Sequence, residues 1–165
     1  MPATAQDGEE DGVVESRHLF AFFTGNSWIP QGRSRETGKK ETVIAPTFGL
    51  DYEYRLSEAW ALGTYNDLTI VNISVERDEE ELVERENTTT FTIGGSCHFT
   101  ERMKVELSAG VETDAHETLR VGRIAYEYGF EMRKNWELGI VASYTWKDFY
   151  DVFGLGLVIS KRCGR

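Results

Sequence analysis

The sequence predicts an all-β fold, an eight-stranded antiparallel up-and-down transmembrane β-barrel. Three observations predict it: apolar and polar residues alternate strictly, eight such segments occur, and short turns alternate with longer connections. The alternation is clearest from Arg123 to Met132, RIAYEYGFEM, where one face is apolar and the other carries Arg123, Glu127 and Glu131. A tilted strand needs roughly 9–11 residues to cross a bilayer, which this stretch supplies.

Composition agrees with paired strands. The 165 residues suit one domain, and at 40% hydrophobic residues and a mean hydropathy of -0.42 no segment reaches the roughly 18 apolar residues of a spanning helix. A membrane barrel remains possible because the residues that line its lumen lower its hydropathy. Aromatic residues make up 12%, and 16 glycines accompany only 3 prolines, a balance typical of twisted strands.

The net charge of -10 argues against a nucleic-acid partner. It comes from segments 1–16 and 75–86, each of which carries a net charge of -5, so the rest of the chain is formally neutral. The first segment has no apolar core of a signal peptide, although Ala3-Thr4-Ala5 resembles a signal cleavage site. We therefore expect either a disordered acidic leader over 1–16 or the remnant of a signal peptide over 1–5, followed by a barrel domain over 17–163.

The first four expected strands differ in how regularly apolar and polar residues alternate. The first contains LFAFFTGN. The second has FGLDYEYRL as its core, with an aromatic residue or leucine at every second position. The third, from Trp60, has the weakest pattern because Thr64 and Asn66 fall on its apolar side. TTTFTIGGSCHF gives the fourth. The expected ranges are 18–26, 43–56, 60–74 and 88–99.

The last four strands are more regular. MKVELSAGVE alternates throughout, the Arg123–Met132 stretch is the core of the sixth strand, and WELGIVASYTWK and DVFGLGLVISKR form the seventh and eighth. The expected ranges are 103–112, 118–132, 136–147 and 151–162. Upstream of Arg123 the alternation is out of phase, since Leu119 and Val121 would point inward. We expect either a bulge near Gly122 or a segment that stands above the bilayer.

Connection lengths indicate the orientation. Turns of about two to four residues follow the second, fourth and sixth strands, whereas segments 31–40 and 75–86 are longer polar loops. Outer-membrane barrels keep their short turns on the periplasmic side. The acidic 75–86 loop could bridge divalent cations to lipopolysaccharide phosphates, but it lacks a cation-binding motif and a solvated loop is the simpler interpretation.

The two faces of the strands decide which side is outside. One face gathers phenylalanine, tyrosine, tryptophan, leucine and isoleucine, and the other gathers glycines and charges. Glycines suit a crowded barrel interior, so we expect the polar face to line the lumen and the apolar face to contact lipid. The expected lumen charges, with a structural or gating role, are Asp51, Glu53, Arg55, Asp67, Lys104, Glu106, Glu112, Arg123, Glu127, Glu131, Glu137 and Lys147. The expected lipid-facing aromatic girdle is Tyr52, Tyr54, Trp60, Phe99, Phe130, Trp136, Tyr144 and Trp146.

FGLDYEYRLSEAWALG and RIAYEYGFEM resemble strands of small Gram-negative outer-membrane β-barrel proteins, the porin-like or OmpA-transmembrane-like eight-stranded family. The resemblance runs through 17–163 and is one of strand pattern, with no catalytic motif. It implies export, location in the cell outer membrane and insertion by the barrel assembly machinery. The chain departs from the pattern at its end, where Cys163 stands in place of the terminal aromatic.

Catalysis is not expected. A lipid A deacylase needs a histidine with a nearby serine and an acid, whereas His98 and His116 occur only in His-x-Thr patterns. Cys97 and Cys163 have neither the number nor the spacing of a disulfide framework or metal site. No cofactor and no metal is therefore expected.

The functional expectation is a monomeric outer-membrane barrel with a structural role, or with passage or binding of very small solutes. Eight strands leave an interior just wide enough for side chains to fill, so the lumen is expected to be plugged by its charges. The expected partners are outer-membrane lipids and lipopolysaccharide, with no nucleic acid. Two alternatives remain: a soluble calycin-like barrel that binds a hydrophobic ligand, and a lipid A-modifying enzyme.

Overall fold

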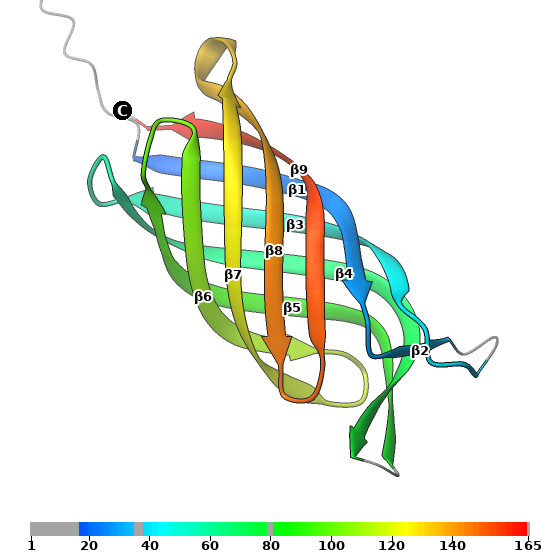
Figure 1. Cartoon of the computed structure of the whole chain (residues 1–165). Helices are drawn as coiled ribbons and strands as arrows, with labels where there is room; N and C mark the ends of the chain where they lie inside the picture. Colours follow the sequence, from blue (N-terminus) through cyan, green and yellow to red (C-terminus); the bar gives the residue numbers. More distant parts are fainter. Residues whose placement is uncertain (1–16, 35–37, 79–80, 165) are drawn as a thin grey trace, which may run out of the picture.

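The computed structural model is a tilted, closed antiparallel barrel (Figure 1). It describes residues 17–34, 38–78 and 81–164. The 1–16 leader and the possible 1–5 remnant lie outside the described residues. The strands are β1 (His18–Ile29), β2 (Gly32–Ser34), β3 (Val43–Arg55), β4 (Trp60–Asp78), β5 (Glu81–His98), β6 (Met103–Thr113), β7 (Thr118–Glu131), β8 (Trp136–Lys147) and β9 (Asp151–Cys163), with a short 3-10 helix η1 (Arg133–Asn135).

Eight long strands form the wall, and each pairs with its neighbours in sequence. β1 pairs with both β3 and β9, and this last pairing closes the barrel. The predicted eight-stranded antiparallel up-and-down fold is confirmed. No helix of the described part is long and apolar enough to span a membrane.

The two ends of the barrel differ. We call the end with the tight β3–β4, β5–β6 and β7–β8 connections the turn rim; the first and last described residues also lie there (Figure 1). We call the opposite end the loop rim. It carries β2 and the outer part of the β4–β5 hairpin, as well as connections 114–117 and 148–150.

The prediction of a long acidic loop over 75–86 is wrong. β4 and β5 continue as a paired ribbon from Asn72↔Glu86 to Asp78↔Glu81, beyond a register shift between Thr69 and Asn72. β2, within the predicted loop 31–40, pairs with β4 at Ile73–Val75. In this ribbon Ile73, Val75 and Arg85 are buried, and the acids that alternate with them face outward. Because acidic residues dominate the segment, its sequence resembles a polar loop although it forms a strand.

The bulge near Gly122, one of the two expected explanations for the change of phase, is absent. The pairings of β7 with β6 and with β8 run through Gly122 without a register shift. Leu119 and Val121 do point inward, but they do so in the continuous phase of the strand. Leu119 packs in an apolar cluster at the loop rim, which explains why an inward position there is apolar.

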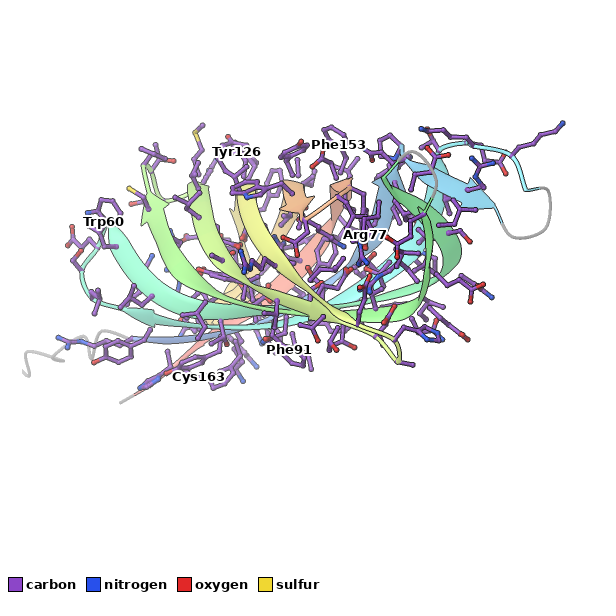
Figure 2. The ribbon with its side chains drawn as sticks, turned by 90° about the horizontal axis from the view of Figure 1, so that it is seen from below. Trp60, Arg77, Phe91, Tyr126, Phe153 and Cys163 are labelled. Atoms are coloured by element: carbon purple, nitrogen blue, oxygen red, sulfur yellow. The ribbon has the colours of Figure 1, made fainter. Side chains whose placement is uncertain are left out.

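The apolar face of the wall is outside. Large hydrophobic side chains from every long strand are exposed, including Phe22, Leu50, Ile93, Leu107 and Leu157. Figure 2 shows Tyr126 and Phe153 projecting away from the barrel. A soluble calycin-like barrel requires the reverse arrangement, with its apolar side chains inside. The structure therefore contradicts the soluble alternative.

Glycines make room inside the wall. A Cβ on Gly25 would lie 2.7 Å from the Cα of Gly156 on β9 and 2.8 Å from Cζ of Phe23. A Cβ on Gly156 would likewise meet the Phe23 ring at 2.6 Å. This glycine pair lets β1 and β9 approach and seats the inward-facing Phe23.

Candidate functional site: the polar lumen

The middle of the lumen contains two basic side chains surrounded by carboxylates. Nζ of Lys104 lies 3.0 Å from Glu53 and 2.7 Å from Glu127. Glu53 also accepts a 3.0 Å hydrogen bond from the hydroxyl of Tyr65, a side chain only 1% exposed. Because β3, β4, β6 and β7 each supply one of these residues, the contacts join half of the wall across the interior.

Arg123 forms the second centre. Its Nη1 lies 2.6 Å from Oδ2 of Asp67, and its Nε lies 3.6 Å from Glu106. Ser108 donates a 2.8 Å hydrogen bond to Glu106, while Asp51 accepts the backbone N–H of Asn66 at 3.0 Å. Five carboxylates (Asp51, Glu53, Asp67, Glu106 and Glu127) thus surround two basic groups, which we call the mid-lumen cluster.

A second cluster, the loop-side cluster, surrounds Arg85. This arginine is fully buried and contacts Glu112 at 2.9 Å and Asp114 at 3.1 Å. Glu112 also accepts a 2.5 Å hydrogen bond from the hydroxyl of Tyr150 and forms an ion pair with Lys147. The paired charges satisfy one another, as the burial of ions requires.

Little space remains inside. One cavity of about 20 Å³ lies among Asp51, Glu53, Lys104 and Arg123, and another of about 20 Å³ lies between Arg123 and Lys147. A cavity needs roughly 10–15 Å³ to hold one water molecule, so each has room for about one. Hydroxyl groups line the second cavity, where Ser27 and Thr47 are hydrogen-bonded at 2.7 Å.

The two rims close differently. At the loop rim a cluster of buried apolar residues lies beyond the charges: Ile29, Ala45, Val71, Ile73, Val75, Leu119, Tyr150 and Val152. At the turn rim a polar cavity of about 490 Å³ is open to solvent, and we call it the vestibule. Arg55 and Glu131, both expected in the lumen, line this vestibule, and Glu137 pairs with Arg162 at 3.3 Å beside it.

The predicted aromatic residues all lie on the outward-pointing face. Trp60, Phe99, Phe130 and Trp136 are exposed near the turn rim, where Tyr52 and Tyr54 are partly exposed. Tyr144 and the exposed Trp146 lie near the loop rim. In Figure 2 Trp60 marks one end of the barrel and Arg77 lies toward the other. The 12-residue β8 carries Trp136 and Trp146 near its two ends; at roughly 3.3 Å per residue and a tilt of 35–45° it rises about 30 Å, enough to cover an apolar band of about 25 Å.

Three lumen residues have roles that the sequence does not predict: Tyr65, Arg85 and Tyr150. Arg85 falls within the expected loop 75–86, and Tyr150 falls between the expected strands 136–147 and 151–162. A usable signal exists for Arg85, because its alternation with Val83 puts both residues on the same face of a strand. Its partners could not be inferred, because they depend on closure of the barrel.

Outside the barrel wall, two carboxylates of the loop rim are stabilised in their charged forms. Burial opposes ionisation of Asp114, but the backbone N–H groups of Glu117 and His116, with Arg85, hold its pKa below the ordinary value. Hydrogen bonds from Lys40 and Arg33 lower the pKa of Glu76. These contacts fix the outer β4–β5 ribbon to β2 and to the 114–117 connection. Among the described residues, no three metal-ligating side chains are placed to hold a metal ion.

The geometry defines a class of protein: an eight-stranded up-and-down barrel with an apolar exterior and a charged, packed interior. Solved structures share this fold. Ail, the attachment invasion locus protein of Yersinia pestis, in complex with the heparin analogue sucrose octasulfate, is similar at a TM-score of 0.55 and 13% identity, covering 87% of this chain and 97% of Ail. A second crystal structure of Ail gives a TM-score of 0.53 at 13% identity, covering 88% and 99%. No family model and no curated protein matches the sequence. At this identity the likeness shows the fold alone.

Proposed function

We propose that this chain is an outer-membrane β-barrel protein of a Gram-negative bacterium, with a closed lumen and a non-enzymatic, structural role. The observation that carries the proposal is the inverted barrel: large apolar side chains outside, and ion pairs that fill the inside. Such an exterior requires lipid, and such an interior requires closure of the wall around its charges. Ail, which shares the fold, is an outer membrane protein.

The closed lumen is supported by the small cavities and the apolar cluster at the loop rim. A hydrated ion needs a continuous water-filled path, whereas the two interior cavities hold about one water each. The surrounding lipids, including lipopolysaccharide, are then the partners of the apolar belt. Insertion by the barrel assembly machinery and a monomeric state belong to the same proposal.

A non-enzymatic role is supported by where the histidines lie. His98 lines the vestibule and points inward, away from the lipid that a deacylase would attack. His18 faces outward, but its Nδ1 is hydrogen-bonded to the Tyr52 hydroxyl at 2.9 Å. Neither provides the serine and acid partners that acyl transfer uses.

The first test is membrane insertion. The refolded protein should remain monodisperse only with detergent or lipid, and its unheated form should migrate differently from its heated form on a gel. A protein that stays monodisperse in plain buffer and shows no heat-dependent shift would rule out the membrane barrel.

The second test is conductance in planar bilayers. We expect no channel events from the native barrel, whereas an open porin reconstituted into the same bilayers should give steady channels. The porin is the positive control for detection, and the heat-dependent gel shift of the reconstituted protein shows that the native barrel has inserted. Steady channels from the native protein would overturn the closed lumen while leaving its membrane location intact.

A further inference from the structure

The apolar outer face carries a polar amide near the middle of the wall, on Asn66 of β4. Its register partners Leu50 on β3 and Phe91 on β5 are both exposed on the outer face, so the Asn66 side chain also points outward. Asn66 lies six residues along β4 from Trp60, which at roughly 3.3 Å per residue and a tilt of 35–45° is about 15 Å. This depth is about 10 Å from the nearer edge of an apolar band of about 25 Å.

The protein satisfies this amide only in part. Nδ2 of Asn66 donates a 2.9 Å hydrogen bond to the backbone carbonyl of Leu50, but Oδ1 has no hydrogen-bond partner among the described residues. A polar group in hydrocarbon without a partner is unfavourable, because ordinary lipid tails offer no hydrogen bonds. The acceptor on Asn66 therefore calls for a donor from outside the barrel, at the depth of the acyl chains.

Asn66 lines an apolar groove on the same outer face, with a volume of about 260 Å³. Four exposed apolar side chains from the neighbouring strands β1, β3 and β4 line it: Phe22, Phe48, Leu50 and Leu68. Thr89 of β5 lines the same groove with a hydroxyl that also has no hydrogen-bond partner among the described residues. Because the groove lies on the lipid-facing side of the wall, its occupant in the membrane is an acyl chain.

We propose that this groove binds a membrane lipid whose acyl chain carries a hydroxyl group near its middle. The hydroxyl donates a hydrogen bond to Oδ1 of Asn66, and the apolar chain on either side of it packs against the phenylalanine and leucine side chains. An unsubstituted chain fills the groove equally well but leaves the acceptor unpaired, so the amide selects the hydroxylated chain. This inference rests on the proposed membrane location, which places the groove in lipid.

Two phospholipids that differ only in this hydroxyl are the probes. The full-length barrel is reconstituted into nanodiscs of palmitoyl-oleoyl phosphatidylcholine, which is replaced stepwise by palmitoyl-ricinoleoyl phosphatidylcholine, and NMR follows the methyl groups of Leu50 and Leu68. One added hydrogen bond should give an about two- to tenfold preference, so the shifts should be half complete when the hydroxylated lipid is about a third to a tenth of the total. Without a preference the shifts change linearly and are half complete at equal amounts.

Two variants test the role of the amide. N66L replaces the side chain by an apolar one of similar shape, so the preference should disappear and the dependence should become linear. N26L is the matched control: it makes the same change at an exposed, outward-facing position of β1 that does not line the groove. The preference should persist in N26L. Both changes make the lipid-facing side more apolar, so neither should prevent insertion.

Three results would overturn the inference: a linear dependence in the native barrel, a preference that survives N66L, or an equal loss of preference in N26L. It would also fail if the Asn66 amide signal followed the protein-to-lipid ratio in the unsubstituted lipid, because a second copy of the chain would then cover the amide. A barrel that needs lipid but shows no preference leaves the membrane location intact. A barrel that is monodisperse in plain buffer removes both.

Discussion

Arg85 is the largest fully buried side chain of the described residues, and its charge is compensated by Glu112 and Asp114. R85M keeps much of the side-chain volume but leaves these carboxylates facing each other without the cation. Breaking a buried ion pair from one side costs about 3–5 kcal/mol. We therefore expect R85M to lower the free energy of unfolding by about that amount, measured by denaturant titration in micelles.

The control for this prediction is R120M, which removes the same charge from an exposed side chain of β7. It should change the free energy of unfolding by less than about 0.5 kcal/mol. Equal effects of R85M and R120M would mean that the buried contacts of Arg85 add nothing beyond net charge.

Gly122 provides a steric test on the outer face. A Cβ at this position would lie 2.2–2.3 Å from the indole of Trp146, so the ring rests on the bare backbone. G122A should displace the indole and destabilise the barrel by about 1–3 kcal/mol. At Gly95, also outward-facing, a Cβ would meet only ordinary contacts at 3.5 and 3.7 Å.

G95A should therefore be tolerated where G122A is not. In a W146A background the G122A penalty should largely disappear, and a double-mutant cycle on unfolding free energies measures this coupling. A penalty that persists without the indole would place the cause in the backbone of β7 rather than in the contact.

At the scale of the element, the outer β4–β5 ribbon depends on charged carboxylates. The pKa values of Asp114 and Glu76 are lowered on folding, so their contribution is present above their ordinary values of 3.8 and 4.5 and is lost as pH falls through the lower folded values. Below about pH 4 we expect less protection against hydrogen exchange in the described part of the ribbon, residues 72–78 and 81–86, than in β4 residues 60–69.

D114N is the matched variant for the acid response. The amide keeps an oxygen for the N–H groups of His116 and Glu117 but has no charge for Arg85. The protection factors of the ribbon amides should then be lower at neutral pH and change less on acidification. If the protection factors of the native ribbon do not change between neutral pH and pH 3, the carboxylates do not hold it.

The elements differ in how well the sequence predicts them. The expected range 136–147 matches β8 at both ends, because the alternation of β8 is complete and turn residues flank it. The expected ranges end β4 too early and begin β5 too late. The acidic residues on the solvent side of the ribbon make this segment look like a polar loop, although Ile73 and Val75 within it are buried. Pairings such as Lys104 with Glu53 need the closed ring, which no single strand encodes.

At the scale of the whole molecule, the interior has more acids than bases. The mid-lumen cluster contains five carboxylates and two basic groups, and among the described residues Asp51 has no ion pair while Asp67 has Arg123 at 2.6 Å. Repulsion between like charges is strong where water is scarce. Asp51 therefore adds repulsion to the folded barrel without a direct counterion.

This imbalance predicts opposite effects for two chemically identical substitutions. D51N keeps the oxygen that accepts the N–H of Asn66 and removes repulsion toward Asp67 and Glu106, so it should stabilise the barrel. D67N removes the closest partner of Arg123 and should destabilise it by about 1.5–3 kcal/mol, the worth of a hydrogen bond to a charged group. Denaturant titrations of both variants at neutral pH in the same micelles measure the difference. Destabilisation by both would mean that the network tolerates no loss of charge, and the barrel interior would then be a fully matched set of ion pairs rather than one with an excess of acid.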